Sequence, residues 1–301
     1  MKFLLTAINA KFIHSNPAIY SLRAGVGEKL QPYVELAEFT INESLESILE
    51  GIWKRQPKVI GFSCYIWNWK LIREILTELP KILPDTEIWL GGPEVTYDGP
   101  GLLREFPQVT GIMVGEGEVT FREVLDQYVR EAESTGQSEQ QPEPDSIEQQ
   151  AADRTGTVAG KSVAERFGQI SGLCLASGYT APRELTDLTT LPFLYEDMEP
   201  FTNRIIYYET SRGCPYRCSY CLSSIDKKVR LRDIDVVKRE LQFFLDQNVK
   251  QVKFIDRTFN CDHKHAMEIW EYIYKHDNGV TNFHFEISAD ILREEEIVLL
   301  N

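Results

Sequence analysis

Three closely spaced cysteines give this sequence its clearest chemical signal. Cys214, Cys218 and Cys221 follow the pattern C-x3-C-x2-C. Thiolates on one short loop can face a common centre, and thiolate ligands select zinc or iron–sulfur clusters. A four-iron cubane bound by three cysteines leaves one iron open to a substrate or cofactor, whereas an electron carrier has all four irons ligated. The spacing therefore favours a catalytic 4Fe-4S cluster.

Other metal sites are consistent with the same loop. A structural zinc ion usually takes four ligands as two separated pairs, and Cys261 or His263 can supply a fourth ligand for zinc or for an electron-transfer cluster. Cys64 and Cys174 lie in apolar runs, so we interpret them as small buried hydrophobic residues. Six cysteines in 301 residues are too few for a disulfide scaffold, which favours a reducing, cytoplasmic location.

The cysteine loop lies within the second of two β/α series. Strand and helix signals alternate at 205–210, 234–244, 252–255, 266–274 and 283–287. An eight-unit barrel needs about 30 residues per unit, so residues 205–301 supply about three units. We expect the first half of a partial (β/α) barrel, apparently truncated, because half a barrel would expose a parallel edge.

Residues 1–130 carry five further β/α units and predict an α/β fold. The strand candidates are 2–8, 34–39, 58–64, 87–90 and 112–114. Asn16 is expected to cap the first helix with Pro17 at its first position, and Pro80 is expected to end the third. Such spacing predicts an open, five-stranded parallel Rossmann-like sheet with helices on both faces. Since ligands bind at the carboxyl ends of such strands, function is expected there.

Between the two series the pattern disappears. Residues 131–168 are rich in Glu, Gln, Ser, Pro and Gly and predict a disordered acidic insertion; residues 169–204 predict a short strand at 169–176 and a connector. The formal net charge of −14 argues against general nucleic-acid binding. No run of about 18 apolar residues exists, so we expect no membrane span, and the apolar start is interpreted as a buried strand rather than a signal peptide.

The segment from Thr210 to Cys221 resembles the signature loop of radical S-adenosyl-L-methionine (SAM) enzymes, and it follows the first barrel strand as in that family. The resemblance implies that the three cysteines bind the 4Fe-4S cluster, that the open iron binds SAM, and that Tyr220 lies beside the adenine. It also implies reductive cleavage of SAM to a 5′-deoxyadenosyl radical, with electrons from an external donor of flavodoxin or ferredoxin type.

The segment after the second barrel strand resembles the Phe-x-Asp-x-x-Phe variant of the cobalamin-linked branch, with Phe254, Asp256 and Phe259 in place of a Gly-Gly-Glu run. By that resemblance Asp256 accepts a hydrogen bond from the amino group of SAM, although a helix-capping Asp is equally consistent. Glu286 and Ser288 end the third strand and are candidates for the ribose or methionine part of SAM; each is equally consistent with a solvated strand end.

The amino-terminal sheet resembles the cobalamin-binding domain of the same branch. Ser63 ends the third strand, Gly91 and Gly92 follow the fourth, and Gly115 and Glu116 follow the fifth. The resemblance implies that Ser63 bonds the nucleotide tail of cobalamin, and the glycines allow backbone to approach a bulky ligand.

One part of that domain's pattern is missing. The Asp-x-His-x-x-Gly loop, whose His ligates cobalt, is absent, so His14 is either the cobalt ligand or a contributor to the helix cap. The aromatic run from Tyr65 to Trp69 can cover a flat macrocycle or pack the next helix. A sheet retained only as a scaffold also stays open.

Taken together, the pattern resembles the cobalamin-binding radical SAM proteins. It predicts an enzyme that carries out methyl transfer or rearrangement on an unknown small-molecule or peptide substrate, and it names no catalytic residue. Two alternatives remain: a non-catalytic iron–sulfur or zinc protein, and a cobalamin-binding module with an inactive truncated barrel.

Overall fold

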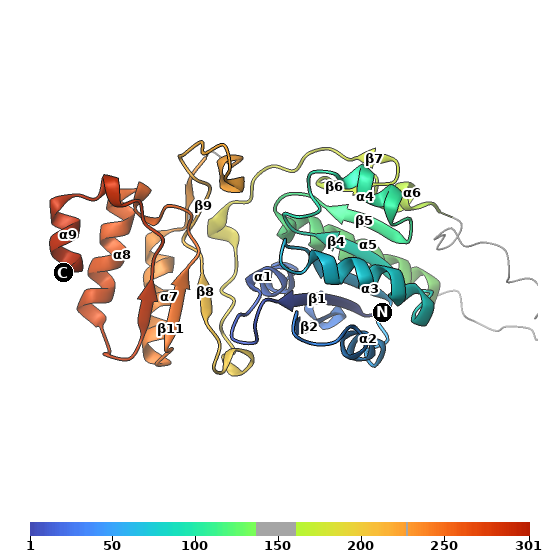
Figure 1. Cartoon of the computed structure of the whole chain (residues 1–301), viewed down its shortest axis with the longest axis horizontal. Helices are drawn as coiled ribbons and strands as arrows, with labels where there is room; N and C mark the ends of the chain where they lie inside the picture. Colours follow the sequence, from blue (N-terminus) through green and yellow to red (C-terminus); the bar gives the residue numbers. More distant parts are fainter. Residues whose placement is uncertain (137–160, 227) are drawn as a thin grey trace, which may run out of the picture. The chain divides into compact units, whose positions relative to one another are not determined.

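The chain folds into two compact units in a computed structural model that describes residues 1–136, 161–226 and 228–301 (Figure 1). Unit 1 consists of residues 1–12 and 16–186, and unit 2 of residues 13–15 and 187–301. The predicted connector at 169–204 is therefore divided between the units at Thr186. Its first part joins unit 1 because it adds strands to the sheet of that unit.

Unit 1 is built on a seven-stranded sheet in the order β2-β1-β3-β4-β5-β6-β7. Its strands are β1 (Phe3–Asn9), β2 (Val34–Thr40), β3 (Val59–Ser63), β4 (Glu87–Gly91), β5 (Val109–Met113), β6 (Leu173–Leu175) and β7 (Gly178–Tyr179). Strands β1 to β5 pair in parallel, which confirms the predicted Rossmann-like sheet. β6 and β7 extend it in antiparallel fashion, so the strand expected at 169–176 is shorter and belongs to this sheet.

Helices cover both faces of this sheet. They are α1 (Pro17–Gly25), α2 (Leu45–Trp53), α3 (Trp69–Ile82), α4 (Gly99–Glu105), α5 (Gly117–Gly136) and α6 (Val163–Phe167). One apolar core lies against α2, α3 and α4, and the other against α1, α5 and α6. Every residue of β1 is buried, as expected for a central parallel strand that is apolar on both sides.

Two predictions about helix ends are wrong. α3 continues through Pro80 to Ile82. α1 does begin after Asn16, but the Asn16 side chain does not cap it. The amide Nδ2 of Asn16 instead donates to Ser63 Oγ at 3.3 Å. Asn16 therefore bonds Ser63, 47 residues away in the sequence, instead of the backbone at the start of its own helix.

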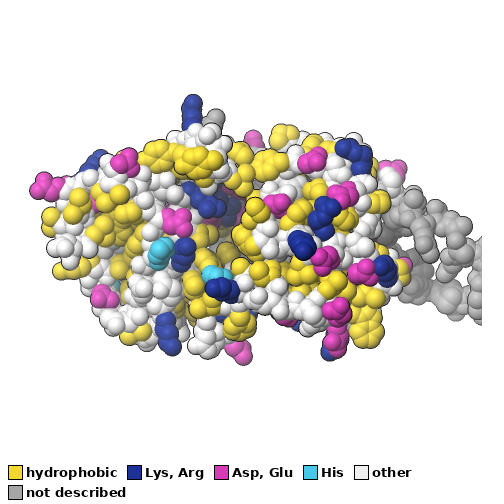
Figure 2. Space-filling view, viewed as in Figure 1, with side chains coloured by type: hydrophobic (Ala, Val, Ile, Leu, Met, Phe, Trp, Pro, Cys, Tyr) yellow, Lys and Arg dark blue, Asp and Glu magenta, His cyan; other side chains and the backbone are white. Residues whose placement is uncertain are grey.

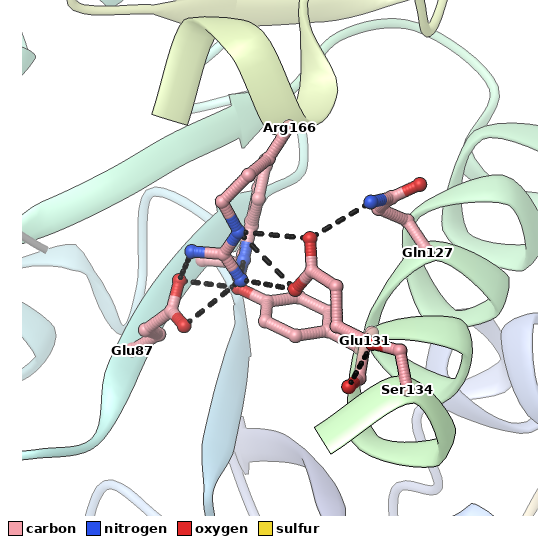
Figure 3. Close-up of polar contacts among 7 residues, drawn as sticks. Glu87, Gln127, Glu131, Ser134 and Arg166 are labelled. Atoms are coloured by element: carbon pink, nitrogen blue, oxygen red, sulfur yellow. Dashed lines mark hydrogen bonds and ion pairs between the residues drawn. The ribbon is translucent and has the colours of Figure 1, made fainter. Parts of the chain in front are cut away.

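The predicted disordered tract is ordered at both ends. α5 extends to Gly136, and α6 begins with a capping box in which Ser162 and Glu165 bond to each other. Arg166 of α6 is buried and bridges Glu87 at the start of β4 to Glu131 of α5 (Figure 3). Residues 137–160, the middle of that tract, lie outside the described residues.

Unit 2 contains a three-stranded parallel sheet in the order β12-β11-β8, with helices between its strands. The elements are β8 (Ile206–Tyr208), β9 (Ser211–Arg212), β10 (Arg230–Leu231), α7 (Ile234–Asp246), β11 (Gln251–Phe254), α8 (His263–His276), β12 (Asn282–His284) and α9 (Glu294–Leu300). This confirms three β/α units of a partial barrel. Residues 13–15 pair alongside the start of β8, where Ile205 N donates to Ile13 O at 2.9 Å, and so cover part of one sheet edge.

On the face of unit 1 drawn in Figure 2, Lys and Arg side chains are interspersed with Asp and Glu. None of the helices in the described part of the chain combines the length and apolar character needed to cross a membrane.

Candidate functional site

The cysteine loop begins beyond the carboxyl end of β8 and is closed at its base by the antiparallel pair β9–β10. Cys214 N donates to Asp226 O at 3.0 Å, which ties the two sides of the loop together. Gly213 has a φ of +95°, and a Cβ there would lie 2.4 Å from Lys228 O. The backbone before the first cysteine therefore requires glycine, and the loop has a fixed entry.

The three thiols of this loop are free of disulfides. Cys214 is buried, and Cys218 and Cys221 are half-buried in a turn where Cys221 N donates to Cys218 O at 3.1 Å. Hydrogen bonds from Ser223 lower the pKa of the Cys221 thiol, which favours the thiolate that metals bind.

The thiols of this loop suit the ligands that a four-iron cluster requires. A cubane takes one thiolate at each of three irons, so its ligands stand farther apart than those of a single ion. The donor set, three free cysteines on one loop with a shared turn, therefore fits a 4Fe-4S cluster.

Asp256 lies beyond the end of β11, and its carboxylate accepts hydrogen bonds from the start of the cysteine loop. Its Oδ1 accepts hydrogen bonds from Thr210 Oγ1 and Ser211 Oγ, both at 2.6 Å, and its Oδ2 accepts one from Thr210 N at 3.1 Å. Burial raises the pKa of its carboxyl, and the bonds from Ser211 and Thr210 oppose that rise. Asp256 does not cap α8, because Asp262 does so through His265 N.

Thr258 makes a second contact from the same segment. Its Oγ1 lies 3.4 Å from Cys214 Sγ, and both residues are buried. Its backbone is fixed, because Cys261 N donates to Thr258 O at 3.0 Å and Phe259 N donates to Glu286 O at 2.9 Å. Sequence reasoning passed over Thr258, which occupies an unspecified position of the Phe-x-Asp-x-x-Phe pattern.

The remaining SAM candidates differ in exposure. The Tyr220 side chain is 91% exposed, so its ring is accessible to a ligand. Glu286 is partly exposed and pairs with Lys253 at 3.3 Å. Ser288 Oγ accepts from Tyr216 OH at 3.2 Å, which links the cysteine loop to the segment beyond β12. The structure thus brings Ser288 to the cysteine loop and leaves Tyr220 at its surface.

In unit 1 the residues predicted to bind cobalamin gather along one edge of the sheet. Ser63 at the end of β3 is level with Gly91, and Gly91 is level with Met113 at the end of β5. Gly115 and Glu116 follow directly, and Glu116 Oε2 accepts from Thr186 N at 2.7 Å. Parallel pairing therefore places three separate sequence segments at one carboxyl edge.

The two glycines of this edge with positive φ differ in their surroundings. Gly92 has a φ of +108°, and a Cβ there would lie 2.4 Å from Cys64 O, a backbone atom. Gly115 has a φ of +81°, and its Cβ would meet nothing within 4 Å. Gly92 is thus required by the packing of two turns, whereas Gly115 leaves open space at the edge.

Asn68, which the sequence analysis read only as part of an aromatic run, organises the turn after β3. Its Nδ2 donates to Ser63 O at 2.9 Å and to Ile8 O at 3.0 Å, and its Oδ1 accepts from Tyr65 N at 2.8 Å. The side chain is fully buried. It therefore joins the ends of β1 and β3 beneath the Ser63 hydroxyl.

Glu38 of β2 fixes the turn after β1 in a similar way. Its carboxylate accepts from Asn9 Nδ2 at 2.9 Å, from Asn16 N at 3.0 Å and from Tyr20 OH at 2.9 Å. No sequence signal identified it, because these partners lie 18 to 29 residues away.

The aromatic run after β3 divides between the two predicted roles. Tyr65 and Trp67 stack with ring centroids 4.3 Å apart, and Trp67 is exposed. Trp69 instead packs against the core of α3 and contacts Phe106. The first pair can meet a flat ligand, and Trp69 is structural.

His14 belongs to unit 2. Its Nδ1 lies 2.5 Å from Tyr207 OH on β8, and Ser15 Oγ donates to Ile205 O at 3.1 Å.

Two protein families match this chain. Residues 4–125 match the B12 binding domain, and residues 208–300 match the radical SAM superfamily. These ranges contain the strand-end edge of unit 1 and the cysteine loop of unit 2.

Individual relatives combine the same two parts. The chain is 26% identical over 229 residues to an uncharacterized methyltransferase of Pyrococcus horikoshii, covering 75% of this chain and 45% of that protein. It is 28% identical over 215 residues to the cobalamin-dependent radical SAM methyltransferase TokK of Streptomyces tokunonensis, covering 68% of this chain and 28% of that one. The chain thus spans less than half the length of these relatives.

A solved structure shows the same fold. The radical SAM methyltransferase TsrM from Kitasatospora setae aligns with a TM-score of 0.66 at 18% identity, covering 100% of this chain and 57% of TsrM.

Proposed function

Because the chain carries a B12-binding domain and a radical SAM domain, and so belongs to the cobalamin-binding radical SAM proteins, we propose that it acts in cobalamin-dependent radical methyl transfer. The observation that supports the proposal most directly is the loop of three free thiols closed by β9–β10. The name of TokK supports methyl transfer as the reaction class. Rearrangement of the substrate is the second candidate.

The cofactors implied by these domains are a 4Fe-4S cluster, SAM and cobalamin. When bound, they supply a 5′-deoxyadenosyl radical and a transferable methyl group. Cys214, Cys218 and Cys221 would each ligate one iron, and Asp256 would fix the entry of their loop through Thr210 and Ser211. Its carboxylate is engaged with that loop, so we assign it to positioning rather than to the amino group of SAM.

We assign the other SAM contacts from exposure and position. Tyr220 presents an accessible ring for the adenine. Glu286 and Ser288, both beyond the end of β12, face the remaining polar groups of SAM in this proposal. Ser288 is the better placed, because Tyr216 already bonds it to the cysteine loop.

In unit 1, Ser63 and the glycines would bind cobalamin. The Ser63 hydroxyl accepts from Asn16 Nδ2 and keeps its own proton to donate to a ligand. Gly91, Gly92 and Gly115 leave the edge free of side chains, so backbone can contact a bulky ligand. The exposed stack of Tyr65 and Trp67 offers an apolar surface beside them.

The electron donor, the substrate and the location follow from the same proposal. Cluster reduction needs an external donor, which we propose is of flavodoxin or ferredoxin type. The substrate is a small molecule or peptide of unknown identity. All six cysteines are free thiols, which supports a reducing, cytoplasmic location.

The test is anaerobic reconstitution with iron and sulfide, followed by EPR of the reduced protein with and without SAM. We expect a cluster signal that changes when SAM is added, because one iron is open. Alanine at all three loop cysteines should abolish the signal. The matched control is Cys261→Ala, which removes a neighbouring thiol outside the loop and should leave the signal unchanged. Loss of the cluster in that control would favour an electron carrier with four protein ligands.

Cobalamin uptake is measured separately by visible absorption. Ser63→Ala should weaken the affinity about tenfold, since a buried hydrogen bond to a ligand contributes on the order of 1.4 kcal/mol. Ser134→Ala is the control, because that hydroxyl donates only to Glu131 O within its own helix. Equal affinities in both variants would contradict the assignment of Ser63, and no uptake by the unmodified chain would leave unit 1 as a scaffold.

A further inference from the structure

The segment after β11 touches the cysteine loop at two points, and only one of them reaches a sulfur. Asp256 bonds to the backbone and hydroxyls of Thr210 and Ser211, whereas Thr258 Oγ1 lies 3.4 Å from Cys214 Sγ. In the free thiol either atom can be the hydrogen-bond donor. Once Cys214 binds iron it has lost its proton, so only the Thr258 hydroxyl can donate.

We propose that Thr258 donates a hydrogen bond to the iron-bound sulfur of Cys214 and thereby raises the reduction potential of the cluster. The inference rests on the proposed cluster site. Reduction adds one negative charge to the cluster, and a hydrogen bond to a sulfur stabilises the reduced form more than the oxidised form. Thr258 therefore tunes the electron-transfer step through the Cys214 sulfur.

Burial strengthens the hydrogen bond from Thr258 to the Cys214 sulfur, because water has little access to either residue. Thr258 is 6% exposed and Cys214 is 7% exposed, so little water competes for the sulfur. A hydrogen bond to a charged acceptor is stronger in such a low-dielectric setting. The bonds from Cys261 N to Thr258 O and from Phe259 N to Glu286 O hold the peptide group that follows Thr258.

The test is a redox titration of the reconstituted full chain, monitored by EPR, with iron and sulfide content measured in parallel. Thr258→Val removes the donor and keeps the shape, whereas Thr258→Ser keeps the donor. We expect Thr258→Val to titrate at a more negative potential, by a tenfold change in the one-electron equilibrium constant, which is about 59 mV. Thr258→Ser should stay close to the unmodified protein. Thr202→Val is the control, because its hydroxyl donates to Glu199 O, a local backbone atom outside the cysteine loop.

Each outcome bears on the inference. Equal midpoints for the valine variant and the unmodified protein, with full iron content, would overturn it and leave the cluster site intact. A serine variant that shifts as far as valine would also overturn it. If Thr258→Val prevents cluster assembly, Thr258→Ala is titrated in its place. If both variants fail to assemble a cluster and Thr258→Ser assembles one normally, the result still assigns the Thr258 hydroxyl to the cluster site. Absence of a cluster in the unmodified protein would instead refute the proposed function itself.

Discussion

Replacement of Arg166 by alanine should destabilise unit 1 more than any exposed charge substitution on the same surface. The Arg166 side chain is fully buried, and its guanidinium bonds both oxygens of Glu87 and both oxygens of Glu131 (Figure 3). Its charged group also lies 5.0 Å from the ring centre of Tyr128 and 4.7 Å from that of Phe167. Alanine would remove the guanidinium that pairs with both carboxylates.

The size of the effect follows from how little water reaches these carboxylates. The side chains of Glu87 and Glu131 are 15% and 19% exposed, and breaking a buried ion pair costs about 3–5 kcal/mol. Glu87 keeps a hydrogen bond from Tyr128 OH at 2.7 Å, so we expect the lower end, about 3 kcal/mol. For a unit of this size that corresponds to a fall in Tm of about 6–12 °C.

The assay is urea and thermal unfolding followed by circular dichroism. Arg130→Ala is the matched control: Arg130 precedes Glu131 on α5, its side chain is 72% exposed, and its pair with Asp126 should contribute less than about 1 kcal/mol. Adding Glu131→Gln to Arg166→Ala should recover part of the loss, because it removes the repulsion between two nearby like charges. Equal stabilities for Arg166→Ala and Arg130→Ala would refute the reasoning.

Two further predictions address the glycine edge and the pH dependence of unit 2. Gly115→Ala should cost about 1–2 kcal/mol of stability through backbone strain, whereas Gly92→Ala must also displace Cys64 O and should lose more stability; equal losses of stability in unfolding assays would contradict this. Burial lowers the pKa of His265 below its ordinary 6.5, and its Nε2 is buried without a hydrogen-bond partner. The unfolded chain therefore takes up the proton first, and stability falls as the pH drops below about 6.5. His265→Leu should flatten that fall in urea titrations between pH 7 and pH 5, and an unchanged slope would count against it.

The sequence predicted the elements of the fold because their signals are local. A central parallel strand is apolar on both sides, and every residue of β1 is indeed buried. The carboxyl-edge residues were also predictable, since parallel pairing brings strand ends together whatever their distance in the sequence. Ser63 and Gly91 are level with each other for this reason.

The errors came from contacts between residues far apart in the chain. Arg166 lies in a polar tract that reads as disordered, but its partners are 35 and 79 residues away. Asn16 has the residue type of a helix cap, but Ser63 takes its side chain. In both cases the sequence pattern was read from neighbouring residues, and a hydrogen-bond partner far away in the sequence determined the structure. The failure at Pro80 is similar, because Leu76 O, which cannot receive a bond from Pro80, accepts one from Gln108 Nε2 at 2.8 Å.

The Phe-x-Asp-x-x-Phe motif combines contacts that are local in the sequence with one contact to a distant segment. Its two aromatic residues, Phe254 and Phe259, contact each other with centroids 5.2 Å apart and pack on Phe285. Its Asp256 reaches back 45 residues to the cysteine loop. The motif therefore couples the packing of the second barrel strand to the entry of the metal-binding loop. The geometry around Cys214 thus depends on the pairing of β8 with β11 as well as on the loop's own sequence, and a change at β11 that left all three cysteines intact should still alter the proposed cluster.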